Sequence, residues 1–207
     1  MKTLLLLSAV VTAMMVMPLA ATAVPPNPTF GTAVVDGQYG EWNLVNDFFS
    51  NMYRAGDSTK AMESKLYLRY DCITNTMYVL VLCEPGVPGY IDPTAATGWI
   101  AIDRVNNKVV NENSGNNGVP PDFAWIGRGY DGNPQHVQGY EASFHILPGT
   151  YEIIAHINVW DDALGTFVAV QTSATPGFPK SGPDLVILDM PSAVQPISLG
   201  ALKAMYR

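Results

Sequence analysis

Apolar residues recur at strand-like spacing along most of the chain. Ten short runs alternate in apolar character, or are continuously apolar, between clusters of Gly, Pro, Asn and Asp, which is typical of β-strands joined by turns. Because each strand would bury one face, we expect two packed antiparallel sheets in a jelly-roll-like β-sandwich, an all-β fold. The predicted strands are 32–35, 65–71, 77–83, 99–103, 108–111, 123–126, 139–147, 150–160, 166–172 and 184–189.

Helical periodicity is confined to residues 52–64 and 199–206, and neither stretch is long enough to organise a core. The second predicts a short C-terminal helical tail. There is no internal repeat and no linker that would separate two domains. The predicted organisation is a signal peptide at 1–23, an extended N-terminal arm at 24–35, a β-sandwich domain at 36–190 and a tail at 191–207.

The first residues are typical of a secretory signal. A basic Lys2 precedes an apolar run, and Ala21-Thr22-Ala23 has the small residues that signal peptidase accepts. A membrane anchor is the alternative, but Pro18 interrupts the run and the run is shorter than the about 20 residues that span a bilayer. We therefore expect cleavage after Ala23, no membrane span in the mature chain, and a secreted, extracellular or cell-surface protein.

Composition limits the partners. The chain carries 11 Lys plus Arg against 18 Asp plus Glu, a net charge of −7, and its basic residues are scattered singly. Nucleic-acid binding needs clustered basic residues that displace counterions, so nucleic acid is excluded as a predicted partner. Removal of 23 of the 207 residues leaves 184, which is a usual size for one domain with a hydrophobic core.

One hairpin is predicted in detail, because Pro148-Gly149 suits the centre of a type II turn between residues 139–147 and 150–160. With Leu147 opposite Thr150, the register would pair His145 with Glu152 and Glu141 with His156 on a half-exposed face. Such pairs would raise the pKa of both histidines. They would lie about 13 Å apart along the strands, too far to share one zinc ion.

Cys72 and Cys83 are the only cysteines, and an exported chain invites a disulfide between them. If residues 65–72 and 77–83 form a hairpin, Cys72 lies opposite Met77 and Cys83 opposite Leu66. The sulfurs would then be about 20 Å apart, beyond the reach of a disulfide. We predict two buried free thiols, although a bulge or a different register would reopen the question.

No catalytic motif stands out. The chain has no Gly-x-Ser-x-Gly elbow, no phosphate-binding glycine loop and no helix start or basic neighbour beside either cysteine. Two carboxylates of a glycoside hydrolase could lie anywhere on a sandwich, so that class stays open.

Two kinds of residue offer a binding function. Tyr90, Trp125 and Tyr130 lie near predicted loops, where aromatic rings can stack on sugar rings, although Trp and Tyr are also abundant in sandwich cores. Asp131 and Asn133 lie in an oxygen-rich turn that could wrap Ca²⁺, and residues 111–118 form a similar run. Left-handed turn conformations explain the same Asn and Gly residues.

Four segments resemble the carbohydrate-binding-module family 9 and DOMON-like β-sandwiches: residues 35–42, with Asp36-Gly37 followed by Glu41-Trp42, the strands at 65–71 and 77–81, and residues 139–144, which begin Gly-Tyr-Glu. The resemblance implies a non-catalytic exported domain that binds saccharide, or in some branches haem, often with structural calcium. No Met and His pair is placed for haem, and residues 49–63 have no counterpart in the family pattern.

The first functional hypothesis is therefore a secreted non-catalytic binding module for extracellular saccharide. The alternative is a structural subunit of an extracellular fibre or surface layer, in which the N-terminal arm adds a strand to the sheet edge of another copy. An unrecognised glycoside hydrolase is the third.

Overall fold

The structure is a computed structural model that describes residues 27–103, 108–172 and 182–188. Every regular element within these ranges is a β-strand, which confirms the all-β class. The predicted signal peptide and the predicted tail with its helix lie outside the described residues. The strands are β1 (Thr29–Phe30), β2 (Phe48–Arg54), β3 (Ser64–Asp71), β4 (Thr76–Cys83), β5 (Gly89–Tyr90), β6 (Gly98–Ile102), β7 (Lys108–Asn111), β8 (Asp122–Ile126), β9 (His136–Val137), β10 (Gly139–His145), β11 (Gly149–Asp161), β12 (Thr166–Thr172) and β13 (Asp184–Ile187).

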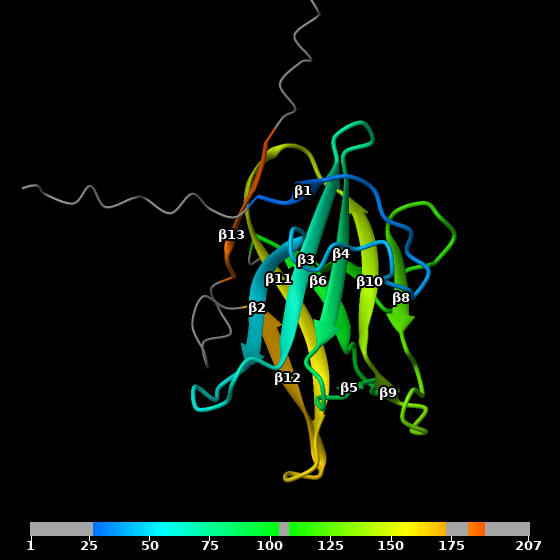
Figure 1. Cartoon of the computed structure of the whole chain (residues 1–207), viewed down its shortest axis with the longest axis vertical. Helices are drawn as coiled ribbons and strands as arrows, with labels where there is room; N and C mark the ends of the chain where they lie inside the picture. Colours follow the sequence, from blue (N-terminus) through cyan, green and yellow to red (C-terminus); the bar gives the residue numbers. More distant parts are fainter. Residues whose placement is uncertain (1–26, 104–107, 173–181, 189–207) are drawn as a thin grey trace, which may run out of the picture.

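The main strands form one antiparallel path, β7-β6-β11-β12-β2-β3-β4-β10-β8, that folds over on itself into two layers (Figure 1). We call the strands β7, β6, β11 and β12 the β11 layer. The strands β2, β3, β4, β10 and β8 form the β3 layer. Pairing between β12 and β2 joins the layers at one edge. Short strands extend them: β5 and β13 pair with β11, β9 pairs with β5, and β1 lies parallel to β3. The predicted two-layer sandwich is confirmed.

Strand alternation builds the core between the layers. On β3 the inward residues Leu66, Leu68 and Tyr70 are fully buried, and on β11 Ile153 and Ile157 are fully buried and belong to the same cluster. Because successive side chains of a strand point to opposite faces, each layer contributes one apolar face to this cluster. The apolar positions of the alternating pattern are therefore the side chains that face the core.

Two predictions at the N-terminal end were wrong. Residues 32–35 form no strand; β1 precedes them at Thr29–Phe30 and pairs with β3 of its own chain. The helix predicted from residue 52 is also absent, because residues 48–54 form β2. A bulge between Phe48 and Ser50 shifts the register of β2, and its inward end is the polar Arg54, so a regular apolar alternation is lost.

The side chain of Arg54 lies buried at the end of β2 that pairs with β12, where it reaches Asp161 at the end of β11. Its guanidinium pairs with the carboxylates of Glu63 and Asp161, both 2.5 Å away at their nearest atoms. These two hydrogen-bonded partners raise its pKa above the ordinary arginine value. A buried charge is tolerated because it is paired and hydrogen-bonded, so the cluster ties the two layers together at this end.

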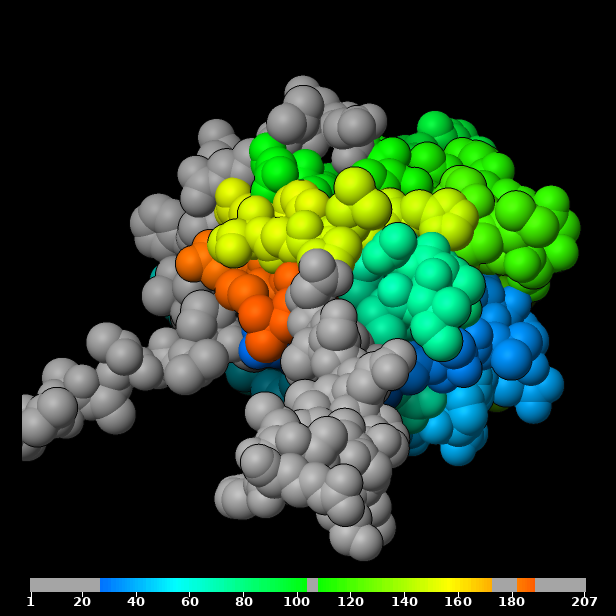
Figure 2. All heavy atoms as spheres, turned by 90° about the horizontal axis from the view of Figure 1, so that it is seen from above, coloured from blue at the N-terminus to red at the C-terminus, as the bar shows by residue number. Residues whose placement is uncertain are grey.

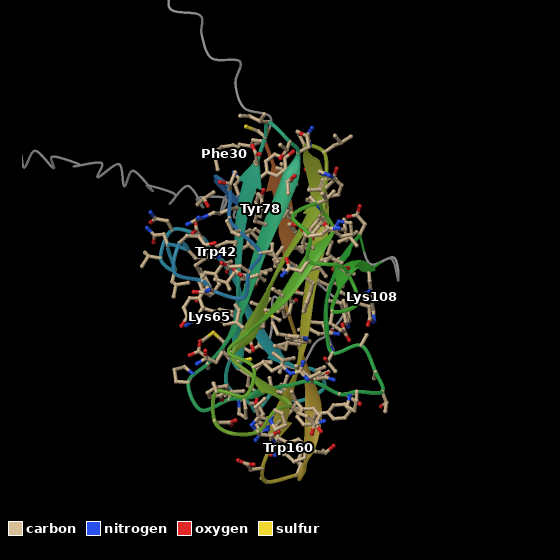
Figure 3. The ribbon with its side chains drawn as sticks, turned by 90° about the vertical axis from the view of Figure 1, so that its right-hand side faces the viewer. Phe30, Trp42, Lys65, Tyr78, Lys108 and Trp160 are labelled. Atoms are coloured by element: carbon tan, nitrogen blue, oxygen red, sulfur yellow. The ribbon has the colours of Figure 1, made fainter. Side chains whose placement is uncertain are left out.

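The segment between β1 and β2 crosses the outer face of the β3 layer. Trp42, with 7% of its surface exposed, packs there against Tyr67, Leu80 and Ile126 in a second apolar cluster. Arg69 on β3 lies 5.0 Å from the centre of the Trp42 ring, a cation–π contact. Figure 3 shows Trp42 on the side of the molecule opposite Lys108.

A buried glutamate anchors this N-terminal segment. Glu141 on β10 is 1% exposed, and its carboxylate accepts hydrogen bonds from the indole Nε1 of Trp42 (2.8 Å) and from the backbone amides of Asp36 and Gly37 (3.2 and 2.9 Å). Gly37 has φ +81°, and a Cβ there would meet the Trp125 carbonyl at 2.6 Å, so only glycine fits. These hydrogen bonds join the Asp36-Gly37 and Glu41-Trp42 motif to the motif that contains Glu141. The two motifs therefore depend on each other structurally.

The predicted hairpin between residues 139–147 and 150–160 was wrong. β10 pairs with β4 and β8, whereas β11 pairs with β6, β12 and β13, so the chain at Pro148-Gly149 passes from one layer to the other. His145 lies opposite Thr76 instead of Glu152. Glu141 and His156 are buried in different layers and form no pair.

The cysteines are free, as predicted. Cys83 lies opposite Ser64, so the predicted β3–β4 register was wrong by two residues. Both residues are partly exposed, so the prediction that both are buried was wrong, but both pack against the core. Burial of the Cys83 thiol raises its pKa to about 12.

No segment of the described residues forms a helix with the length and apolar character needed to cross a bilayer.

Candidate functional site

An aromatic surface lies at the end of the molecule where β11 turns into β12. Trp160 and Phe167 are directly opposite each other across these strands. Their neighbours Val159 and Ile157 point into the core, so by strand alternation Trp160 lies on the outer face of the β11 layer. Figure 3 shows Trp160 at the end of the molecule far from Phe30.

Tyr90 joins these two rings from β5. Gly89 pairs with Val159 of β11, which places Tyr90 on the same outer face. The Tyr90 ring lies 5.0 Å from Trp160 and 5.6 Å from Phe167, nearly parallel to the latter at 11°. Phe167 is 37% exposed, while Tyr90 and Trp160 are half-buried. We call Tyr90, Trp160 and Phe167 the aromatic platform.

A histidine held between two polar side chains borders the platform. His136 on β9 lies opposite Tyr90, with ring centres 6.2 Å apart. Its Nδ1 donates to Asp131 Oδ2 at 2.6 Å, and its Nε2 accepts from the side-chain amide of Asn133 at 3.1 Å. The hydrogen bond to His136 lowers the pKa of Asp131. The imidazole is held by these neighbours, so its orientation toward the platform is set before any ligand arrives.

Further polar groups surround the rings. The indole Nε1 of Trp160 donates to Asp162 Oδ1 at 3.0 Å, and the side-chain amide of Gln135 donates to the Ile91 carbonyl at 3.3 Å. Flat apolar rings beside planar carboxylate, amide and imidazole groups suit a ligand with apolar C–H faces and hydroxyl edges.

A second aromatic pair lies farther along the outer face of the β11 layer. Trp99 on β6 stacks on His156 of β11 with ring centres 4.6 Å apart, and the Lys108 ammonium lies 4.9 Å from the Trp99 ring centre. His156 Nε2 donates to Asn158, and its Nδ1 accepts from Gln171. Burial lowers the pKa of His156 to about 4, so the predicted rise was wrong. The Trp99 ring already contacts both His156 and Lys108. We therefore assign this pair to packing within the protein and not to ligand binding.

The residues predicted as a ligand site are not together. Tyr90 lies in the platform. Trp125 on β8 points inward and contacts Phe123 and Tyr140 edge-on. Tyr130, 47% exposed, lines a separate pocket of about 240 Å³ with Tyr39 and other residues.

The residues predicted to bind calcium are engaged with their neighbours. Asp131 Oδ1 accepts from the Asn133 amide and its Oδ2 from His136, while Asn133 Oδ1 accepts from the Gln135 amide. Among the described residues, no group of three or more His, Cys, Asp or Glu side chains is arranged to hold a metal ion. A calcium site at this turn stays a prediction.

Sequence reasoning did not select Trp160, Phe167 and His136. A signal was present for the first two, because the turn at residues 162–165 places them opposite each other and strand parity places both outside. His136 depends on a contact between two separate two-residue strands, and no sequence pattern indicates strands so short.

Solved structures similar to this chain include two carbohydrate-binding modules. One is a carbohydrate binding module family 9 from Caldicellulosiruptor kristjanssonii in complex with glucose, 16% identical, with a TM-score of 0.47 over 83% of this chain and 99% of that chain. The other is a carbohydrate binding module family 9 from the same organism in complex with cellotriose, 17% identical, with a TM-score of 0.48 over 83% of this chain and 97% of that chain. The family named for both is one that the sequence motifs resemble. No family model and no curated protein matches the chain. The saccharides belong to those structures, and no ligand of this chain follows from them.

Proposed function

We propose that this chain is a secreted, non-catalytic module that binds extracellular saccharide on the aromatic platform. The observation that carries the proposal is the joined set of Tyr90, Trp160 and Phe167 rings on an outer sheet face, bordered by His136 and Asp162. Rings provide the stacking surface, and the polar border provides hydrogen bonds that fix the orientation of a sugar.

The polar border favours binding over hydrolysis. A glycoside hydrolase needs one carboxyl group to protonate the leaving oxygen and a second to act as base or nucleophile. Asp131 instead pairs with His136, and Asp162 accepts from the Trp160 indole. Asp162 thus holds a ring of the platform, and Asp131 holds the histidine that borders it.

Binding is tested by titrating the purified protein with soluble β-glucan and xylan in a calorimeter and by co-sedimentation with cellulose. We expect saturable binding to at least one polysaccharide. Phe167→Ala should weaken it about tenfold, equivalent to about 1.4 kcal/mol. Phe48→Ala is the matched control, because Phe48 is 41% exposed against 37% for Phe167 but lies in the β3 layer.

If Phe167→Ala and Phe48→Ala weaken saccharide binding equally, the aromatic platform is not the binding site. Concentration-dependent polymers in place of saccharide binding would favour the strand-addition alternative. Release of reducing sugar from a bound polysaccharide would favour the hydrolase.

The calcium prediction is tested separately. If Asp131 and Asn133 bind Ca²⁺, the melting temperature should rise on adding CaCl₂ and fall with a chelator, because a ligand that binds the folded state stabilises it. Asp131→Asn should remove the response.

A further inference from the structure

A pocket of about 310 Å³ opens on the outer face of the β3 layer, away from the aromatic platform. Its floor is a row of three residues on neighbouring strands: Tyr78 on β4, Ser143 on β10 and Asp122 on β8. One wall is the N-terminal segment at residues 33–35, and the other comes from the loop at 116–120. The blue N-terminal segment and the green loop lie side by side at this edge (Figures 1 and 2).

The floor holds a buried carboxylate that lacks a counter-ion. Asp122 is 3% exposed, and the hydrogen bond recorded for its side chain comes from the Asn117 backbone amide to Oδ1, at 2.9 Å. Among the described residues no Lys, Arg or His side chain forms an ion pair with it. A buried charge without a paired partner is costly, so a cation in the pocket would be bound strongly.

A hydroxyl beside this carboxylate also lacks a partner. Ser143 is 1% exposed and lines the pocket, and no hydrogen bond of its hydroxyl is found among the described residues. Its oxygen is not one of the fully buried atoms without a partner, which belong to Ser64 and Thr97, so it reaches the open space of the pocket. Ser143 lies directly opposite Asp122, so both groups can accept from one donor.

The walls suit an aliphatic stem. Ala33, Val34 and Val35 line one side and Pro120 the other, while Asn116 adds an amide at the edge. Burial, followed by the charges of Asp71 and Asp122, raises the pKa of Tyr78, so its phenol stays protonated and neutral. The pocket therefore combines apolar walls with a negative floor.

We propose that this pocket binds the primary ammonium group of a small aliphatic amine, with Asp122 as its counter-ion and Ser143 as a hydrogen-bond acceptor. An ammonium has three donors and no acceptor, which matches a floor of acceptors. A bare metal ion would leave the apolar walls without a function. The net charge of −7 also favours the approach of cations.

The probe is n-butylammonium chloride, titrated into the ¹⁵N-labelled full chain and followed by amide chemical shifts. We expect saturable shifts confined to residues 33–35, 116–122 and 142–144. 1-Butanol, which is neutral, should bind at least tenfold more weakly. Asp122→Asn should weaken butylammonium binding at least tenfold, whereas Asp184→Asn, an exposed aspartate on β13, should leave it unchanged.

Ser143→Ala provides a second test if Asp122→Asn does not fold, and it should weaken binding severalfold. The proposal is overturned if butylammonium gives no saturable shifts, if butanol binds equally well, or if Ca²⁺ saturates these residues and butylammonium does not. None of these residues belongs to the platform, so the result is independent of saccharide binding.

Discussion

Two buried groups should give opposite pH dependence to the stability of this protein. Glu141 lies under the N-terminal segment, and burial raises its pKa from 4.5 to about 7. His156 lies under Trp99, and burial lowers its pKa from 6.5 to about 4. Both groups are neutral in the folded state over the same range of pH, but they titrate with opposite sign in the unfolded chain.

The signs follow from the protons that each state binds. Glu141 contributes stability that is complete below pH 4.5 and is lost as pH rises to about 7, since the unfolded carboxyl ionises first. His156 has the opposite effect: as pH falls from 6.5 toward 4, the unfolded imidazole takes up a proton that the folded one does not. Each shift corresponds to about 3 kcal/mol across its window, or about 1.4 kcal/mol per pH unit.

The two slopes nearly cancel in the native chain between pH 4.5 and 6.5. Glu141→Gln should therefore leave the histidine slope, so that the free energy of unfolding rises with pH. His156→Gln should leave the glutamate slope, so that it falls with pH. The double variant should again be nearly flat, which makes it the internal control.

The measurement is urea unfolding followed by tryptophan fluorescence at half-unit steps of pH, for the native chain and the three variants. The comparison rests on slopes, because Gln at position 141 also alters hydrogen bonds to Trp42 at every pH. Slopes of the same sign in both single variants, or slopes unchanged from the native chain, would show that Glu141 and His156 do not have these opposite shifts.

Three other sites should give measurable effects on stability or on chemical reactivity. Arg54→Met should lower the free energy of unfolding by about 3 to 5 kcal/mol in urea denaturation, because it leaves the buried Glu63 without its ion pair and leaves Asp161 only Lys60, 3.9 Å away, whereas the exposed Arg128→Met should be nearly neutral. Gly139→Ala should lower the melting temperature far more than Gly40→Ala, since a Cβ at residue 139 would lie 1.9 Å from a carbonyl oxygen and one at residue 40 would meet nothing within 4 Å. Mass spectrometry after iodoacetamide treatment should find Cys83 unmodified until the chain unfolds, as a thiol pKa of about 12 leaves little thiolate; rapid labelling in native buffer would contradict this.

The strands that sequence patterns found are those whose inward residues are uniformly apolar. Residues 65–71 and 77–83 alternate cleanly because Leu66, Leu68, Val79 and Val81 face one core. β2 was missed because a bulge breaks its period and a salt-bridged arginine occupies an inward position. The alternation of apolar residues in a sequence reveals strands that bury apolar side chains. In β2 the buried side chain at residue 54 is an arginine stabilised by ion pairs, which this alternation does not reveal.

The path of the chain after Pro148 and the site were harder to predict. A Pro-Gly pair suits a hairpin, but here it lies where the chain crosses between layers, and only contacts with distant strands distinguish the two. The position of Tyr90 near a loop indicates an accessible ring, but its stacking on Trp160 and Phe167 becomes visible only in the structure. Such partners are brought together by pairing between distant strands, which cannot be deduced from each residue and its local sequence alone.

The joining of early and late segments has a kinetic consequence. The amide of Gly37 binds a carboxylate 104 residues farther along the chain, and β2 takes one of its two sheet neighbours from β12. Folding rates fall as the sequence separation of native contacts grows, because distant segments must meet before their contacts stabilise anything. A nascent chain that ends before residue 166 has no β12 to cover the free edge of β2. Closure of the two layers must therefore wait until residues 166–172 have been synthesised.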